Sequence, residues 1–123
     1  MSKEVYTLMT KVFVYGSLKK GYGNHRLLTT SKLLGEHTTE PAYSMFSMGS
    51  FPFVETNGET GIKGEVYEVN EDVFSTLDIL EGYPTFYDRK YIDTPYGSAW
   101  MYFIDSPRRE RDHYLQIHSG IWT

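Results

Sequence analysis

The chain has 123 residues, a net charge of −4 and no cysteine, with 11 tyrosines and 7 phenylalanines. This length suits one domain with a single core, and the many aromatic rings favour a sheet. The negative charge argues against a nucleic-acid partner, the lack of cysteine excludes disulfides and thiolate catalysis, and no segment has the length of a membrane span, so a cytoplasmic location is expected.

Residues 1–10 show no clear periodicity, which predicts a loosely attached leader. At residues 12–18 an apolar run ends in a Gly-Ser pair, a pattern typical of a strand that is buried on both faces and turns at the glycine. Such a turn leaves N–H groups unpaired and can form a small anion-binding concavity. The alternative is an ordinary buried strand with a tight turn. Residues 26–28 are expected to form a single helical turn.

Short strands are predicted for the next part of the chain. Residues 32–37 and 38–48 alternate β-branched or aromatic residues with polar ones, which indicates two strands. Residues 49–54 carry aromatic residues on both sides of a proline and are predicted as an edge strand or a loop. Asn57-Gly58 is a hairpin turn signal. Residues 62–69 alternate apolar and polar positions and predict a further strand.

One helix is predicted with both of its ends. Asn70 is expected to cap its first turn, apolar residues then recur at helical spacing, and Gly82 is expected to end it. Residues 86–94 and 98–104 follow as two more strands. Ser106-Pro107 has the form of a helix start and predicts a short second helix.

Glu81 lies in the last turn of the predicted helix, where a carboxylate faces the negative end of the helix dipole. The neighbouring residues are apolar and aromatic, so partial burial is expected to raise its pKa. A general acid/base needs this combination, although a solvated glutamate in a last turn is the alternative.

Several short motifs occur in a defined order along residues 11–104. They are Tyr-Gly-Ser-Leu at 15–18, Gly-x-x-Pro at 49–52, Gly-Glu-Val-Tyr at 64–67, Leu-Asp and Glu-Gly within 77–82, and Tyr-x-Arg at 87–89. This ordered set resembles the γ-glutamylcyclotransferase-like family, which includes γ-glutamylamine cyclotransferases and AIG2-like proteins. Residues 105–123 then form a C-terminal extension of the one domain.

The resemblance implies an α+β fold, a small mixed and partly closed β-barrel of about six or seven strands with one or two packed helices. It also implies that Glu81 is the catalytic acid/base and that no metal or cofactor takes part. The substrate-binding residues that it implies are Tyr15, Gly16, Ser17 and Leu18, whose backbone amides hold a carboxylate, with Tyr87 as a pocket wall and Tyr114 as a hydrogen-bonding partner.

The reaction implied by the resemblance is internal to a small γ-glutamyl substrate. The α-amine attacks the γ-carbonyl and gives 5-oxoproline and a free amine. The alternative is a barrel that keeps the pocket as a binding or interaction module without turnover. The leaving amine stays open between an amino acid, a lysine ε-amine and a polyamine, with Glu36, Glu55 and Asp105 as candidates for attracting a cationic amine. The choice between monomer and homodimer is also left open.

Overall fold

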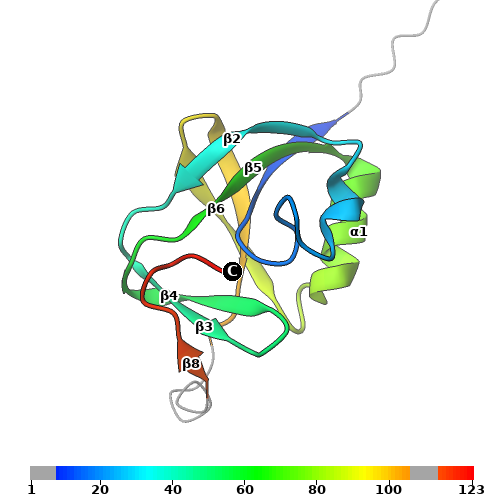
Figure 1. Cartoon of the computed structure of the whole chain (residues 1–123). Helices are drawn as coiled ribbons and strands as arrows, with labels where there is room; N and C mark the ends of the chain where they lie inside the picture. The colour runs from blue at the N-terminus through cyan, green and yellow to red at the C-terminus, as the bar shows by residue number, and fades with distance from the viewer. Residues whose placement is uncertain (1–7, 106–113) are drawn as a thin grey trace, which may run out of the picture.

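The computed structural model describes residues 8–105 and 114–123. The predicted helix at Ser106-Pro107 and the first seven residues of the predicted leader lie outside the described residues. Five strands form one sheet in the order β2 (Lys32–Thr38), β5 (Lys63–Asn70), β1 (Met9–Val14), β7 (Gly97–Phe103) and β6 (Asp88–Thr94) (Figure 1). Three strands form a second sheet in the order β4 (Pro52–Thr60), β3 (Tyr43–Ser47) and β8 (Leu115–Gln116).

Two helical segments complete the described part of the chain: a 3-10 turn, η1 (His25–Leu28), and one α-helix, α1 (Glu71–Glu81). The fold is therefore α+β, as predicted. It has eight strands rather than six or seven, because the predicted extension contributes β8. Within the described residues no strand ladder joins the two sheets, so the predicted barrel is not confirmed. Neither helical segment here has the length and apolar character that a membrane crossing requires.

Strand β1 lies in the middle of the larger sheet, antiparallel to β5 and parallel to β7. Its side chains alternate between two cores: Val12 and Val14 pack on the side of α1, whereas Phe13 packs with residues of the smaller sheet. All three are almost completely buried, which confirms the prediction of a strand buried on both faces. The strand begins at Met9, so the sheet starts within the predicted leader.

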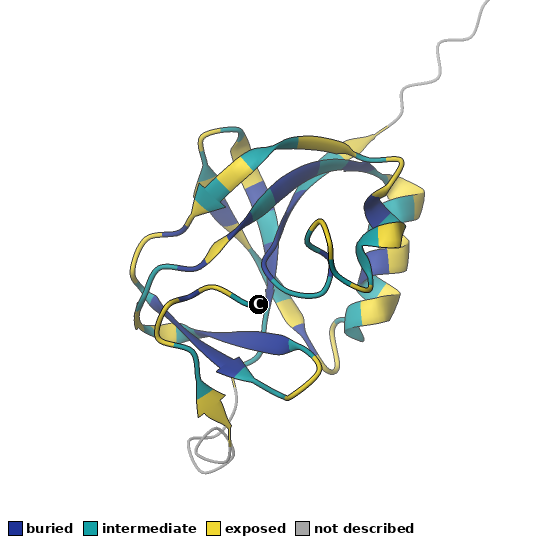
Figure 2. Ribbon diagram, viewed as in Figure 1, coloured by how far each residue is buried: buried dark blue, intermediate teal, exposed yellow. Residues whose placement is uncertain are grey.

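Helix α1 packs along one end of the larger sheet, with its outer face exposed (Figure 2). Asn70 Oδ1 accepts a hydrogen bond from the Val73 N–H at 2.9 Å, which confirms the predicted cap. Gly82 ends the helix in the left-handed region, with φ +65°, where glycine has no Cβ to clash. Leu77 is fully buried against the sheet, so the helix end has a fixed position over β1 and β5.

The predicted hairpin turn at Asn57-Gly58 is wrong, because both residues lie within β4. The register between β3 and β4 shifts there: Tyr43 pairs with Thr60, whereas the next residue, Ser44, pairs with Glu55. The extra residues of β4 form an irregularity, and the Ser44 hydroxyl donates to the Asn57 carbonyl at 2.9 Å. The predicted edge position of residues 49–54 is confirmed, since β4 begins at Pro52 and is an edge strand of its sheet.

Candidate active site

A cavity of about 260 Å³ lies where the end of β1, the β3–β4 loop and the end of α1 meet. The residues that line it include most of the predicted site residues: Tyr15, Gly16, Ser17, Leu18, Glu81 and Tyr87. The chain thus brings the turn after β1 and the last residue of α1, which are far apart in sequence, to one cavity. Both elements can therefore contact a single bound ligand.

The turn after β1 leaves backbone donors without partners among the residues that the structure describes. The carbonyls of Gly16 and Ser17 accept from the N–H groups of Lys19 and Asn24, at 3.0 and 2.9 Å. The Asn24 side chain also donates to Ser17 Oγ at 2.8 Å, which fixes the loop. Among the described residues, none accepts a hydrogen bond from the N–H of Gly16, Ser17 or Leu18. We call these three N–H groups the amide cradle, because consecutive free amides of this kind can hold an anion.

Gly16 allows the β3–β4 loop to lie against the amide cradle. A Cβ on this residue would lie 2.8 Å from two atoms of the Pro52 ring, closer than carbon atoms can approach. The buried Tyr87 donates its hydroxyl proton to the Pro52 carbonyl at 2.7 Å and holds the loop from the other side. Tyr15 is tied in the same way, since its hydroxyl donates to the Tyr102 carbonyl at 2.8 Å. The cavity wall is therefore preorganised by packing and by hydrogen bonds.

Glu81 is the last residue of α1 and is half-buried in the cavity wall. Burial raises the pKa of its carboxyl from the ordinary 4.5 to about 7. Burial also raises the pKa of Tyr15 and of Tyr87, and the negative charge of Glu81 adds to both effects. These phenols stay protonated near neutral pH. The Glu81 carboxyl, in contrast, can both accept and release a proton there.

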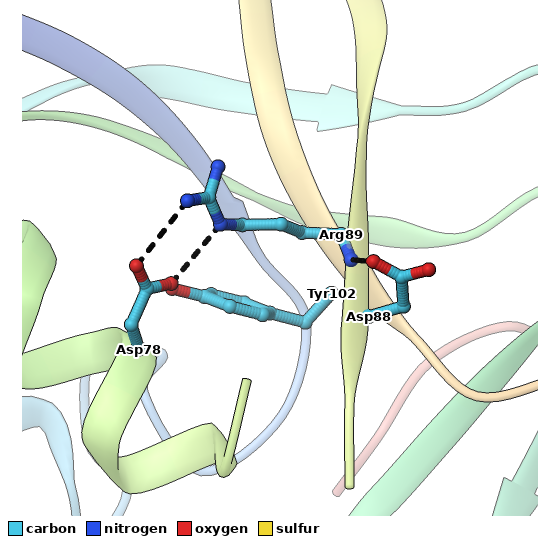
Figure 3. A network of polar contacts seen from close by, with 4 residues as sticks. All are labelled: Asp78, Asp88, Arg89 and Tyr102. Atoms are coloured by element: carbon cyan, nitrogen blue, oxygen red, sulfur yellow. Dashed lines mark hydrogen bonds and ion pairs between the residues drawn. The ribbon is translucent and has the colours of Figure 1, made fainter. Parts of the chain in front are cut away.

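A network of polar contacts fixes the last turn of α1 to the larger sheet (Figure 3). The Tyr102 hydroxyl donates to Asp78 Oδ1 at 2.7 Å, and Arg89 donates to both oxygens of the same carboxylate, from Nε at 3.1 Å and from Nη2 at 3.3 Å. Burial and the Asp78 carboxylate raise the pKa of Tyr102, so this cavity residue is neutral. Asp78 precedes Glu81 by one helical turn, and the network therefore determines where Glu81 lies.

The Arg89 guanidinium is also surrounded by aromatic rings. It lies 4.0 Å from the ring centroid of Tyr83, 4.3 Å from that of Trp100 and 4.6 Å from that of Phe74. Its side chain is only 14% exposed, so both the ion pair and the cation–π contacts are partly desolvated and stronger than at a surface. This aromatic surround connects α1, the segment after it and β7.

Tyr114 is the predicted binding residue that the structure places elsewhere. It does not line the cavity, and its ring packs edge-on against Phe53, with the centroids 5.4 Å apart. The physical reason is that β8, the next element, pairs with the edge of β3 and lies away from α1 in Figure 1. The geometry thus gives no support for a hydrogen bond from Tyr114 to a substrate.

The predicted acidic candidates for a cationic amine do not line the cavity either. These are Glu36, Glu55 and Asp105. Asp105 accepts hydrogen bonds from the N–H and the hydroxyl of Thr56, at 2.9 and 2.7 Å, and so stabilises strand β4.

Nine of the residues that line the cavity were not predicted as site residues, and four of these are Asn24, Phe51, Phe86 and Tyr102. Tyr102 lies in the strand predicted at residues 98–104, and the alternation of side chains along this strand is the signal that could have found it. The other three lie on loops, which local sequence patterns do not place in space.

The fold and the cavity define a small α+β protein with a carboxyl group of raised pKa beside an amide turn. The profile of the family described as "Gamma-glutamyl cyclotransferase, AIG2-like" matches residues 12–123. The chain therefore belongs to the γ-glutamyl cyclotransferase, AIG2-like family.

Relatives of known sequence and structure agree with this assignment. A protein of Vibrio cholerae named "Putative gamma-glutamylcyclotransferase" is 43% identical over 111 residues, which cover 90% of this chain and 93% of the relative. The family protein YtfP of Escherichia coli K12 is 38% identical over 112 residues, which cover 91% and 95%. The solution structure of YtfP from Escherichia coli has a TM-score of 0.74 at 37% identity and covers 92% of this chain and 96% of YtfP. An uncharacterized protein of Pyrococcus horikoshii has a TM-score of 0.76 at 30% identity and covers 91% and 88%.

Proposed function

We propose that this protein is a γ-glutamyl cyclotransferase that converts a γ-glutamyl amide into 5-oxoproline and a free amine, with Glu81 as the general acid/base. The observation that carries the proposal is that Glu81 and the amide cradle line the same cavity. One supplies a proton carrier, and the other supplies donors for a carboxylate. Both are needed to hold and cyclise a γ-glutamyl group.

The amide cradle binds the α-carboxylate of the substrate. Free backbone N–H groups in a turn bind anions without a basic side chain, and none of the described residues that line the cavity is a lysine or an arginine. Hydrogen bonds from amides to a carboxylate are charge-assisted and directional. The substrate is thereby anchored at one end, with its γ-carbonyl directed toward Glu81.

Catalysis then consists of positioning and proton transfer. Glu81 takes a proton from the α-ammonium group, and the resulting amine attacks the γ-carbonyl carbon to form the new C–N bond. Glu81 passes this proton to the leaving nitrogen and transfers a second one in the same direction, the old C–N bond breaks, and the amine leaves as an ammonium ion. No water is consumed, and the carbonyl oxygen stays in 5-oxoproline.

The raised pKa of Glu81 suits this transfer. The α-ammonium group has a pKa of about 8, and a carboxylate of ordinary pKa is a weak base toward it. A pKa of about 7 brings donor and acceptor close together. The second contribution to the rate is that the site holds the substrate in a folded conformation. Correct orientation of an intramolecular reaction can lower the barrier by about 7–11 kcal/mol.

The test compares the wild-type protein with Glu81→Gln on a panel of γ-glutamyl amines and γ-glutamyl amino acids, with 5-oxoproline as the measured product. Loss of a general acid/base is expected to lower kcat by roughly 100-fold or more. Equal product release by the two proteins would remove Glu81 from the mechanism. Thermal stabilisation by γ-glutamyl ligands without any product would instead identify a binding module.

A further inference from the structure

The cavity opens to solvent between apolar side chains. Leu80 and Phe86 line the cavity and are 41% and 51% exposed, whereas Tyr15 and Leu18 at its inner end are buried. Phe51, from the β3–β4 loop, contacts Phe86 edge-on with the ring centroids 6.4 Å apart. We call Phe51, Leu80 and Phe86 the apolar mouth.

Backbone contacts hold the two aromatic rings of the apolar mouth in place. The Phe86 N–H donates to the Gly82 carbonyl at 2.8 Å, and its ring packs edge-on against Tyr87 with the centroids 5.2 Å apart. The Phe51 carbonyl accepts from the Met48 N–H at 2.8 Å, which closes a tight loop. The exposed ring of Phe86 and the half-buried ring of Phe51 are therefore preorganised as a binding surface.

The charge of the cavity restricts what can bind at this mouth. Apart from Glu81, the described residues that line the cavity include no aspartate, glutamate, lysine, arginine or histidine. A leaving group with its own carboxylate would approach Glu81 without a compensating cation. A leaving group with a second ammonium group would find only Glu81, which the reaction needs for proton transfer. Burial of either charge without a partner is costly.

We propose that the preferred leaving group is an uncharged apolar amine, so that the substrates are γ-glutamyl amides of alkyl or arylalkyl amines. This inference rests on the proposed function, because the amide cradle and Glu81 set the direction of the substrate. With the α-carboxylate on the cradle and the reacting amide beside Glu81, the amine substituent extends toward the neighbouring Leu80 and Phe86. The apolar mouth then removes it from water.

The test uses four substrates that differ only in the leaving group: γ-glutamyl phenethylamide, γ-glutamyl methylamide, γ-glutamyl-β-alanine and γ-glutamyl putrescine. We expect kcat/KM for 5-oxoproline release to be at least about tenfold higher with the phenethylamide than with each of the others. An equal or higher value with the anionic β-alanine or the cationic putrescine substrate would overturn the inference. The proposed cyclotransferase activity would then still stand.

A pair of variants tests the residue that we place at the mouth. Phe86→Ala is expected to reduce the ratio of kcat/KM between phenethylamide and methylamide to near one. Ile79→Ala is the matched control, because Ile79 lies on α1 next to Leu80, is 81% exposed and does not line the cavity. This variant is expected to keep the wild-type ratio. An equal loss with both substrates in Phe86→Ala would mean a structural role only and would overturn the inference.

If no substrate gives 5-oxoproline, the proposed function is refuted. A binding experiment then tests the apolar mouth by itself. Titration calorimetry then measures the affinity of the protein for each of the same four compounds. Tighter binding of the phenethylamide in the wild type, lost in Phe86→Ala, would uphold the apolar mouth for a protein that only binds. Equal affinities for all four compounds would overturn it.

Discussion

Replacing Glu81 by glutamine is expected to stabilise the protein at neutral and alkaline pH. The pKa of Glu81 is about 7 in the folded protein, against an ordinary value of 4.5 that applies to the unfolded chain. Between these two values the folded protein holds a proton that the unfolded chain has lost. Stability therefore falls as the pH rises from about 4.5 to about 7. Below this range both states are protonated, and above it the full cost of the buried charge is present.

The size of the effect follows from the two pKa values. One pKa unit corresponds to about 1.4 kcal/mol, so the buried carboxylate costs at most roughly 3.5 kcal/mol at pH 8, less any screening by solvent in the open cavity. Glutamine has nearly the same shape and carries no charge, so Glu81→Gln removes this cost. Such a gain is typical of an active-site residue that is kept for activity at the expense of stability.

Urea unfolding of the wild-type protein and of Glu81→Gln, at intervals from pH 4 to pH 8.5, measures the prediction. The difference in the free energy of unfolding between the two proteins cancels the titration of all other groups. It should grow in favour of the variant across the interval from about 4.5 to about 7 and then stay constant. A difference that is the same at every pH would refute the argument that burial perturbs Glu81.

Three further results are expected. The kcat/KM of the wild type should rise with pH through about 7, because the base must be ionised in the free enzyme; a flat profile on both sides of pH 7 would contradict this. Gly16→Ala should lower kcat/KM about 10- to 100-fold in steady-state assays by displacing the proline ring packed on Gly16, whereas Gly23→Ala, where a Cβ meets no atom within 4 Å, should not. Arg89→Lys keeps the charge but loses the paired hydrogen bonds to Asp78 and the flat contact with the rings, so it should cost about 1–2 kcal/mol in urea unfolding; unchanged stability would contradict the role of the network.

The elements that were predicted best are those specified by local signals. The helix from Glu71 to Glu81 has a capping side chain at Asn70 and a glycine in the left-handed conformation at its end, and both signals lie within a few residues. Strand β1 was predicted as buried on both faces from four consecutive apolar residues. These signals need no knowledge of distant parts of the chain.

The predictions that were wrong or were not confirmed concern features that depend on contacts between distant parts of the chain. Asn57-Gly58 has the composition of a hairpin turn, yet Ser44 on β3 binds the Asn57 carbonyl and keeps both residues within β4. The barrel was implied by the resemblance, and the two sheets of the described residues do not confirm it. The pairing of β8 with β3 joins residues about 70 positions apart, which local patterns do not predict. Tyr114 was assigned to the site from the family resemblance, while the pairing of β8 with β3 sets its position.

The two parts of the candidate site, the amide cradle and Glu81, were predicted from different kinds of evidence. The free amides after β1 were predicted from a strand that ends in Gly16-Ser17. Glu81 was noticed because a carboxylate in the last turn of a helix faces the negative end of the helix dipole. Their meeting in one cavity was expected only from the family resemblance, since no local pattern measures the distance between two elements. The apolar mouth was not predicted, because Phe51 and Phe86 lie on loops.

Isotope labelling of the product tests the central claim, the attack of the substrate's own amine. The wild-type protein is incubated with a γ-glutamyl amide in water enriched in oxygen-18, and the products are analysed by mass spectrometry. We expect unlabelled 5-oxoproline and the free amine in equal amounts, because cyclisation retains the carbonyl oxygen and consumes no water. Glutamate that carries one oxygen-18 atom, with no 5-oxoproline, would show hydrolysis and contradict the account.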